Sequence, residues 1–205
     1  MGQNAECNLH KKIGILGGSF DPIHNGHLHM AKAAYEQYEL DEVWLIPNGH
    51  APHKDEDKMT DSVHRLAMCN LLADEYAFLK TCDIEIKSEE SSYTYLTMQK
   101  LTQMYPDYDF YFIMGADSLD YFEKWRNPDI IASLCKILVV NRDEFTMEDM
   151  KEKIFRINQF FSANIQIVKC EKYDVSSTEI RRGKKLDDVH PKVKEYMLQN
   201  HLYGL

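Results

Sequence analysis

The sequence predicts an α/β fold, a doubly wound parallel sheet with helices on both faces. Short apolar runs alternate along the chain with longer stretches of helical periodicity. Turn-forming residues close several of these runs, as Gly17-Gly18 and Pro47-Asn48-Gly49 do. A strand, a helix and a second strand in succession form a parallel βαβ unit, so this alternation indicates a sheet between two helical layers.

Six apolar runs are predicted to be the strands. They are residues 13–16, 43–46, 81–86, 109–114, 136–140 and 165–168. Helices are expected over about residues 26–38, from 60 or 61, from 92 to before 106, from 128, over 147–160, and from 176 and 191. In sheets of this kind ligands bind beyond the carboxyl ends of the strands. The loops to inspect are those after Leu16, Ile46, Met114 and Val140.

Three helix starts carry specific signals. Thr60 or Asp61 is expected to cap the second helix, and Ser92 to cap the third. Asn127 followed by Pro128 is typical of an N-cap and a first helical residue. The second helix is expected to turn one stripe toward the core, namely Val63, Leu66, Ala67, Asn70 and Leu71.

Composition limits the possible classes of protein. The chain has 205 residues, of which 44% are hydrophobic, enough for one domain over residues 13–205 after a polar N-terminal extension, residues 1–12. The net charge of −9 argues against a protein that coats nucleic acid, which needs a broad basic surface. No apolar run approaches the roughly 18 residues of a membrane helix, and residues 1–12 lack the apolar core of a secretory signal.

The five cysteines are odd in number and never form a C-x-x-C pair. A disulfide framework or a zinc site is therefore not expected, and the scattered thiols favour a reducing cytosol. The protein is expected to be soluble and cytoplasmic.

The loop after the first strand carries the main chemical signal. Gly17 and Gly18 let backbone amides come close to a ligand, and His24 and His27 share one face of a helix start. A helix N-terminus attracts anions. Nucleotidyl transfer needs donors aimed at phosphate charge and no protein nucleophile. The alternative is a zinc site in which Asp21 would be the nearest third ligand; the glycine pair favours phosphate.

A second phosphate site is expected near the C-terminus. Ser176 and Glu179 fit a capping box, so a helix should begin there, with hydroxyls and free amides in its first turn. Arg181 follows one turn later. Alone this is an ordinary capped helix; paired with the first loop it indicates a clamp for departing pyrophosphate.

Both segments resemble known motifs. Residues 17–27 resemble the H-x-G-H motif of the nucleotidyltransferase superfamily, whose sheet is Rossmann-like, and residues 176–181 resemble its S-S-T-x-I-R signature. Further stretches are similar to the bacterial nicotinate-mononucleotide adenylyltransferases: residues 44–48, 52–54, 92–94, 114–119 with Trp125, and 201–203. At residues 87–90, Lys-Ser-Glu-Glu stands near where that family often has an arginine.

The resemblance implies roles for individual residues. The groups that would handle the ATP phosphates are Gly17, Gly18, His24 and His27, with His27 acting at the transition state. The groups that would hold pyrophosphate are Ser177, Thr178 and Arg181. Gly115 and Asp117 would meet the nucleoside of ATP, and Mg²⁺ would arrive with ATP. The mononucleotide site would consist of Ser19, Phe20, Lys54, Thr94 and Trp125, with Arg142 as a further phosphate partner.

Several alternatives stay open. The acceptor would be nicotinate mononucleotide or its nicotinamide counterpart, since backbone amides can read either ring substituent. Another adenylyl or cytidylyl transferase, acting on phosphopantetheine or a phospho-alcohol, is disfavoured by Trp125 and residues 92–94. A tRNA synthetase catalytic domain would lack an RNA-reading domain here. A non-catalytic nucleotide sensor is disfavoured by the intact histidines. A homo-oligomer is possible.

Overall fold

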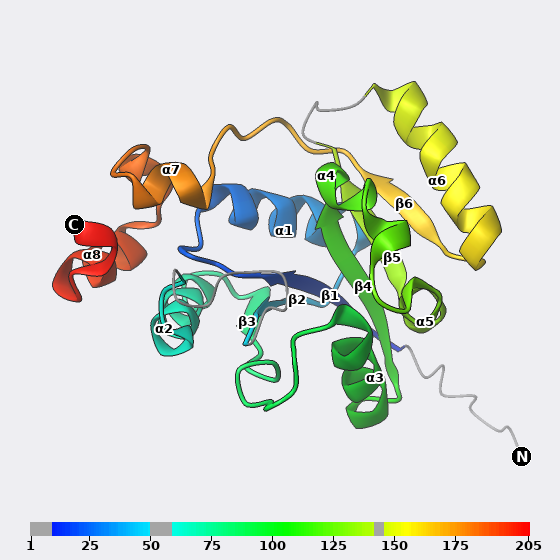
Figure 1. Ribbon diagram of the computed structural model, residues 1–205, viewed down its shortest axis with the longest axis horizontal. Coiled ribbons are helices and arrows are strands. Elements are labelled where there is room, and N and C mark those ends of the chain that lie inside the picture. Colours follow the sequence, from blue (N-terminus) through cyan, green and yellow to red (C-terminus); the bar gives the residue numbers. More distant parts are fainter. Residues whose placement is uncertain (1–9, 50–58, 142–145) are drawn as a thin grey trace, which may run out of the picture.

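A computed structural model describes residues 10–49, 59–141 and 146–205 of the chain. Its centre is a six-stranded sheet in the order β3-β2-β1-β4-β5-β6, in which every neighbouring pair is parallel (Figure 1). The strands are β1 (Lys11–Gly18), β2 (Glu42–Pro47), β3 (Leu79–Thr81), β4 (Tyr108–Gly115), β5 (Lys136–Val140) and β6 (Ile165–Val168). The predicted doubly wound α/β fold is confirmed.

The crossovers between these strands are helical. The α-helices are α1 (Asn25–Tyr38), α2 (Ser62–Ala73), α3 (Thr94–Met104), α4 (Ala116–Leu119), α5 (Pro128–Leu134), α6 (Met147–Phe161), α7 (Ser177–Arg181) and α8 (Pro191–Gln199). Short 3₁₀ turns are η2 (Phe122–Lys124), η3 (Leu186–Asp188) and η4 (Leu202–Gly204). No helix of the described residues is long and apolar enough to span a membrane.

The strand order reverses between β1 and β4. From β1 the chain first builds outward through β2 and β3, and then returns to add β4, β5 and β6 on the other side. Leu16 pairs with Ile113 across this junction, so the loop after β1 and the start of α4 lie at the same edge of the sheet. Such a reversal opens a crevice beyond the strand ends, which is where ligands of this fold class bind.

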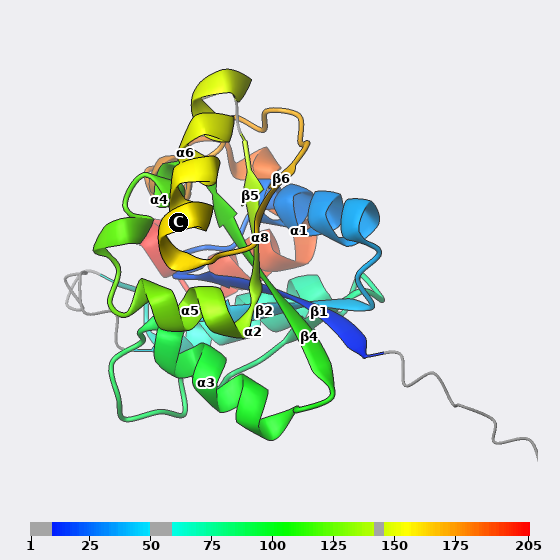
Figure 2. The same cartoon turned by 90° about the vertical axis from the view of Figure 1, so that its right-hand side faces the viewer.

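Alternate residues of the central strands build two cores. On one face, Leu16 of β1 and Ile113 of β4 pack with α1, α2, α7 and α8. On the other face, Ile15 and Phe112 pack with α3, α5 and α6. Figure 2 shows α3 and α5 side by side on this second face. A sheet buried on both faces explains why its strands are almost continuously apolar.

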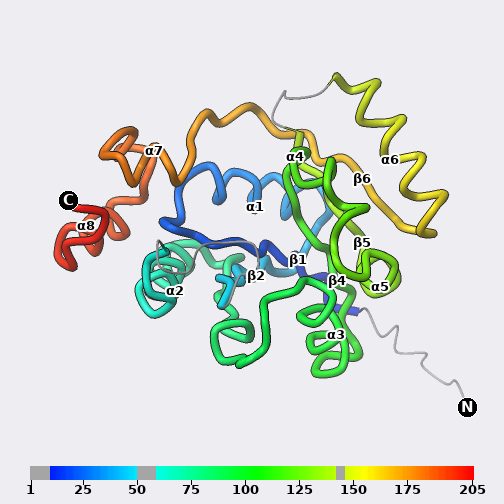
Figure 3. Tube along the Cα trace, in the orientation of Figure 1, coloured from blue at the N-terminus to red at the C-terminus, as the bar shows by residue number. Residues whose placement is uncertain are grey.

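The C-terminal segment lies at one end of the molecule, where it packs beside α2 (Figure 1). Helix α8 packs against α2, far from it in the sequence, and the tube in Figure 3 shows the two lying together. Leu202 of η4 is buried in the same core as both helices. The last turn of the chain is thereby anchored close to the loop that follows β1.

The third predicted strand lies earlier in the chain than expected, because β3 covers Leu79–Thr81 and shares only Thr81 with the predicted residues 81–86. β3 stops at Thr81, and the chain turns after it, with Lys87 N–H donating to Asp83 C=O at 3.0 Å. The alternating apolar residues Cys82 and Ile84 do not extend the sheet; they pack against the second core from a turn. Alternation of apolar and polar residues indicates which side chains are buried. A segment at the edge of a sheet can bury its side chains without hydrogen-bonding to a neighbouring strand.

The predicted face of α2 was also wrong. The helix buries Arg65, Met68, Cys69 and Leu72, whereas Val63 is 65% exposed. The reason is Arg65, whose hydrogen bonds inside the molecule fix the rotation of the helix. Asp61 caps α2 as predicted, by accepting the Val63 N–H at 2.9 Å.

Two other predicted caps differ in detail. Ser92 does not cap α3; Tyr93 is the N-cap, and the Ser92 hydroxyl accepts the N–H of Gly49 at 3.0 Å instead. Asn127 precedes Pro128 at the start of α5 as predicted, but its side chain makes no capping hydrogen bond. Through this hydrogen bond, Ser92 links the loop after β2 to the start of α3.

Candidate active site

The loop after β1 lies at the crevice and has an unusual backbone. Gly17 and Gly18 end the strand, and Phe20 adopts a φ of 48°, a left-handed conformation that is rare for a large side chain. The Phe20 ring is 2% exposed and belongs to the core. The predicted role of Phe20 toward a mononucleotide remains a prediction.

His24 and His27 meet at the start of α1. Their rings stack with centroids 3.8 Å apart, and the edge of Phe20 supports His27 at 5.1 Å. His27 Nδ1 accepts the backbone N–H of His24 at 3.2 Å. In a neutral imidazole this leaves the proton on Nε2, where it is a donor. His24 is buried, while His27 is half-buried and can reach a ligand.

This geometry disfavours the zinc alternative. The two imidazoles stack instead of converging on a point, and His27 Nδ1 is occupied by the backbone. Asp21, the nearest third ligand by sequence, has its carboxylate engaged by Tyr203. Within the described ranges, no cluster of histidine, cysteine, aspartate or glutamate side chains has the arrangement of a metal site.

Gly26 is required by close packing. A Cβ built on Gly26 would lie 2.8 Å from Val175 Cγ1, closer than real Cβ atoms approach, and would make a tight contact of 3.0 Å with the His24 ring. Val175 directly precedes the capping residue of α7. The glycine of the H-x-G-H motif therefore lets the second motif pack against the first.

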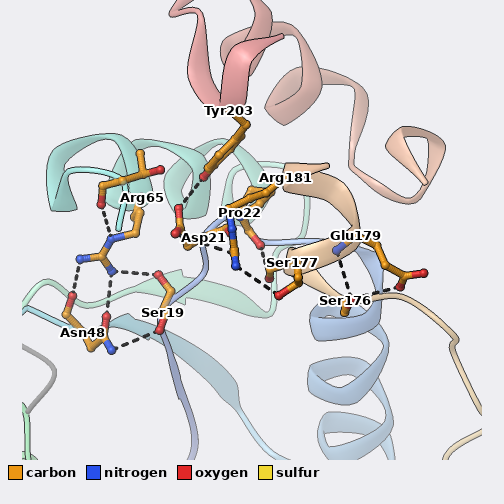
Figure 4. Close-up of polar contacts among 12 residues, drawn as sticks. Ser19, Asp21, Pro22, Asn48, Arg65, Ser176, Ser177, Glu179, Arg181 and Tyr203 are labelled. Atoms are coloured by element: carbon orange, nitrogen blue, oxygen red, sulfur yellow. Dashed lines mark hydrogen bonds and ion pairs between the residues drawn. The ribbon is translucent and has the colours of Figure 1, made fainter. Parts of the chain in front are cut away.

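Helix α7 is docked onto the loop by two of its own candidate residues (Figure 4). The Ser177 hydroxyl donates to the C=O of Pro22 at 2.9 Å, and Arg181 donates to the C=O of Asp21 at 2.6 Å. Arg181 also donates to the Thr178 hydroxyl at 3.1 Å. Ser176 accepts the Glu179 N–H at 3.2 Å, as its predicted cap requires. The structure thus joins the two predicted phosphate segments into one site.

Asp21 is a buried carboxylate inside this junction. It is 5% exposed, accepts the Tyr203 hydroxyl at 2.7 Å, and faces Arg181 at 3.9 Å. Burial, together with the negative charge of Asp21, raises the pKa of Tyr203, so the hydroxyl stays protonated and donates. Tyr203 lies in a stretch that resembles the family, yet the sequence gives no reason to place it here.

Arg65 is a site residue that the sequence reasoning missed. Its guanidinium is 1% exposed and donates to the backbone C=O of Ser19 at 2.8 Å and of Thr60 at 2.9 Å. It also donates to both the side-chain and backbone oxygens of Asn48, at 2.9 and 2.8 Å. Burial lowers the pKa of Arg65, while the charge of Asp21 opposes this.

The guanidinium therefore fixes the loops after β1 and β2 to each other. Asn48 in turn donates to the Ser19 hydroxyl at 3.3 Å. The available sequence signal was a single arginine in register with Met68, Cys69 and Leu72, spaced as one helical face.

The two predicted pyridine-binding residues lie on segments that contact each other. Thr94 is the first residue of α3, and Trp125 follows η2 and packs edge-on against Phe112 at 5.9 Å. Their neighbours join the segments, since the Arg126 guanidinium lies 4.8 Å from the centroid of the Tyr93 ring. Trp125 is only partly buried, so part of it remains available to a ligand.

The remaining candidates divide into two groups. Gly115 is the N-cap of α4 and Asp117 is in its first turn, so both lie at the carboxyl end of β4 beside the loop after β1. Lys54 and Arg142 fall outside the described residues. Their predicted roles toward the mononucleotide remain predictions.

Known proteins resemble this chain over most of its length. A family model described as cytidylyltransferase-like matches residues 15–183. A probable nicotinate-nucleotide adenylyltransferase of Shewanella pealeana is 39% identical, over 94% of this chain and 95% of the relative. The nicotinate-nucleotide adenylyltransferase of Bacillus subtilis is 38% identical, over 94% and 98%.

A solved structure shares the fold. It is that of the Plasmodium falciparum nicotinic acid mononucleotide adenylyltransferase complexed with NaAD, with a TM-score of 0.76 and 22% identity over 95% of this chain and 98% of that one. With the matched family model and curated relatives, the chain belongs to the cytidylyltransferase-like family and to the nicotinate-nucleotide adenylyltransferases.

Proposed function

We propose that this enzyme transfers the adenylyl group of ATP to nicotinate mononucleotide, giving the deamido dinucleotide and pyrophosphate. The observation that carries the proposal is the junction of the two motifs: Ser177 and Arg181 of α7 are hydrogen-bonded to the backbone of the loop that leads to His24 and His27. The junction lies at the crevice between β1 and β4. The names of the curated relatives support the choice of acceptor.

In the proposed reaction a phosphate oxygen of the mononucleotide attacks the α-phosphorus of ATP in line. The new P–O bond forms as the bond between the α-phosphorus and the bridging oxygen breaks, and pyrophosphate leaves with that oxygen. His27 would donate from Nε2 to the phosphate charge that grows during transfer, and Arg181 would hold the departing pyrophosphate. No protein nucleophile takes part; the residues position the reactants and stabilise charge.

We propose MgATP as the nucleotide substrate, with Mg²⁺ carried by the phosphates, as is common where a nucleotide supplies most of the ligands. We also propose that the enzyme works in the cytoplasm. Within the described residues, Cys69, Cys82 and Cys135 are free thiols. A reducing compartment keeps thiols in that state.

The test follows pyrophosphate release from ATP and Mg²⁺ with nicotinate mononucleotide, and in parallel with nicotinamide mononucleotide. Turnover with the nicotinate substrate at the higher kcat/KM is expected. The reverse preference would shift the assignment to the amide substrate. Binding of ATP without pyrophosphate release with either acceptor would indicate a nucleotide sensor and overturn the proposal.

A further inference from the structure

The Arg181 guanidinium is held by hydrogen bonds to two groups of the protein itself. One N–H of its guanidinium bonds to Asp21 C=O and another to Thr178 Oγ1, at 2.6 and 3.1 Å. A guanidinium has five N–H donors, so these bonds fix its plane and leave donors for an anion. The side chain is 35% exposed, which gives an anion access to it.

The Asp21 carboxylate faces the same guanidinium from a buried position. Its Oδ2 lies 3.9 Å from Arg181, and its Oδ1 accepts the Tyr203 hydroxyl at 2.7 Å. Tyr203 also forms a side-chain hydrogen bond with Thr60. With its donor committed to Asp21, the hydroxyl fixes the rotation of the carboxylate (Figure 4).

The segment that carries Tyr203 is itself fixed. Leu202 is 9% exposed within the core shared by α2 and α8. Tyr203 adopts a φ of 60°, a left-handed backbone that strains a tyrosine. Core packing and the bond to Asp21 together hold it there, 182 residues from its partner. A strained residue that is held in place in this way frequently serves a functional site.

We propose that Tyr203, acting through Asp21, is a positioning residue for Arg181 and so sets the affinity of the enzyme for pyrophosphate and for the β- and γ-phosphates of ATP. The inference rests on the proposed function for the identity of the reaction. It concerns anion binding by Arg181, which can be measured without turnover.

The experiment measures the dissociation constant of inorganic pyrophosphate by titration calorimetry, and KM for each substrate. Tyr203→Phe keeps the ring and removes the hydroxyl. It is expected to raise the pyrophosphate Kd about tenfold, the order that one hydrogen bond to a charged group supplies. KM for ATP should rise with it, while KM for the mononucleotide should change less than about twofold.

A double-mutant cycle with Arg181→Lys tests the route of the effect. Because Tyr203 acts through Arg181, Tyr203→Phe should weaken pyrophosphate binding little further in the Arg181→Lys background. Additive losses in the double mutant would overturn the proposal. The matched control is Tyr196→Phe, which removes another C-terminal hydroxyl, 2.9 Å from His64 Nδ1, outside this network; it should leave the pyrophosphate Kd unchanged.

Two results separate the possible failures. A Tyr203→Phe variant that melts earlier yet binds pyrophosphate like the wild type shows a structural role only, and overturns the inference. If Tyr203→Phe weakens pyrophosphate binding but the wild-type protein transfers no adenylyl group, the inference is supported and the proposed function fails.

Discussion

Within the stacked pair of imidazoles, the two histidines differ in what they can offer a phosphate. His24 is buried at 4% exposure and starts α1, whereas His27 is half-buried and holds its Nδ1 on the backbone. The donor best placed to meet a ligand is His27 Nε2. The spacing in the sequence treated the two histidines alike, whereas the structure favours His27 over His24 as the donor to a phosphate.

Replacing His27 with alanine should lower kcat about a hundredfold or more, because one preorganised donor to transition-state charge is lost. Steady-state pyrophosphate release measures this. His29→Ala is the control, since His29 lies on the same helix against Tyr173; it should keep most of the activity. Near-normal turnover of folded His27→Ala would remove His27 from the mechanism.

Gly26→Ala tests the packing between the two motifs. The new methyl group would meet Val175 Cγ1 at 2.8 Å, and α7 would have to move away from the loop. We expect a loss of about 1–3 kcal/mol in the free energy of unfolding, as for other overpacked sites, with reduced turnover. Val175→Ala removes the clashing atom, so the double variant should recover part of both losses in denaturant titration and assay. A double variant no better than Gly26→Ala would contradict this account.

Arg65→Lys tests the buried clamp. Lysine cannot make the forked set of bonds to Ser19, Thr60 and Asn48, so buried carbonyls lose donors. The free energy of unfolding should fall by about 2–4 kcal/mol, and KM for the mononucleotide should rise more than KM for ATP. Arg156→Lys, at an exposed pair with Glu123, should stay within about 0.5 kcal/mol. Equal effects of the two substitutions on chemical denaturation would refute the clamp.

At the scale of secondary-structure elements, the sequence predicted the position of most strands and helices. The errors arose where tertiary contacts, and not the local pattern of apolar residues, decide which residues are buried or paired. β6 and the starts of α6 and α8 match the expected residues. The pattern of α2 pointed to a stripe through Val63 because an arginine was not counted as a core residue. β3 lies at residues 79–81 instead of the predicted 81–86, because Cys82 and Ile84 pack on the core without pairing with β2.

The face of α2 can be checked by a pair of substitutions. Leu72→Ala should cost about 2–5 kcal/mol of unfolding free energy, since Leu72 is 1% exposed and a cavity would remain. Val63→Ala should cost no more than about 0.5 kcal/mol, since Val63 is 65% exposed. Urea titration of both variants decides between the two faces. A larger cost at Val63 would restore the face expected from the sequence.

In the molecule as a whole, the two helical layers bury both faces of the sheet. Cys69 lies in one core and Cys135 in the other. Burial raises the pKa of the Cys135 thiol to about 12 and raises that of Cys69 as well. Both thiols therefore stay protonated near neutral pH and are shielded from reagents while the two cores are intact.

Thiol labelling should therefore report unfolding of the whole molecule. In the native protein a thiol-specific alkylating reagent should leave Cys69 and Cys135 unmodified, and both should react together as denaturant unfolds the chain. Mass spectrometry after timed labelling measures each site, with the half-buried Cys82 as an internal comparison. Rapid native labelling of either buried thiol would show that its core opens independently.

The sequence by itself determined the alternation that builds a parallel sheet and the two motifs that carry the chemistry. Both features can be predicted from local sequence. The turn residues that end strands, the helix caps and the spacing of His24 and His27 depend only on residues close to each other in the chain. The net charge of −9 likewise argued against a protein that coats nucleic acid.

Only the tertiary structure decided how these parts meet. Ser177 reaches Pro22 across 155 residues, Arg181 reaches Asp21 across 160, and Tyr203 reaches Asp21 across 182. The roles of Arg65 and Tyr203 follow from hydrogen-bond partners that the fold brings together. No local pattern encodes such partners, because a single arginine or tyrosine has the same neighbours in sequence whether it lies in solvent or in a buried site.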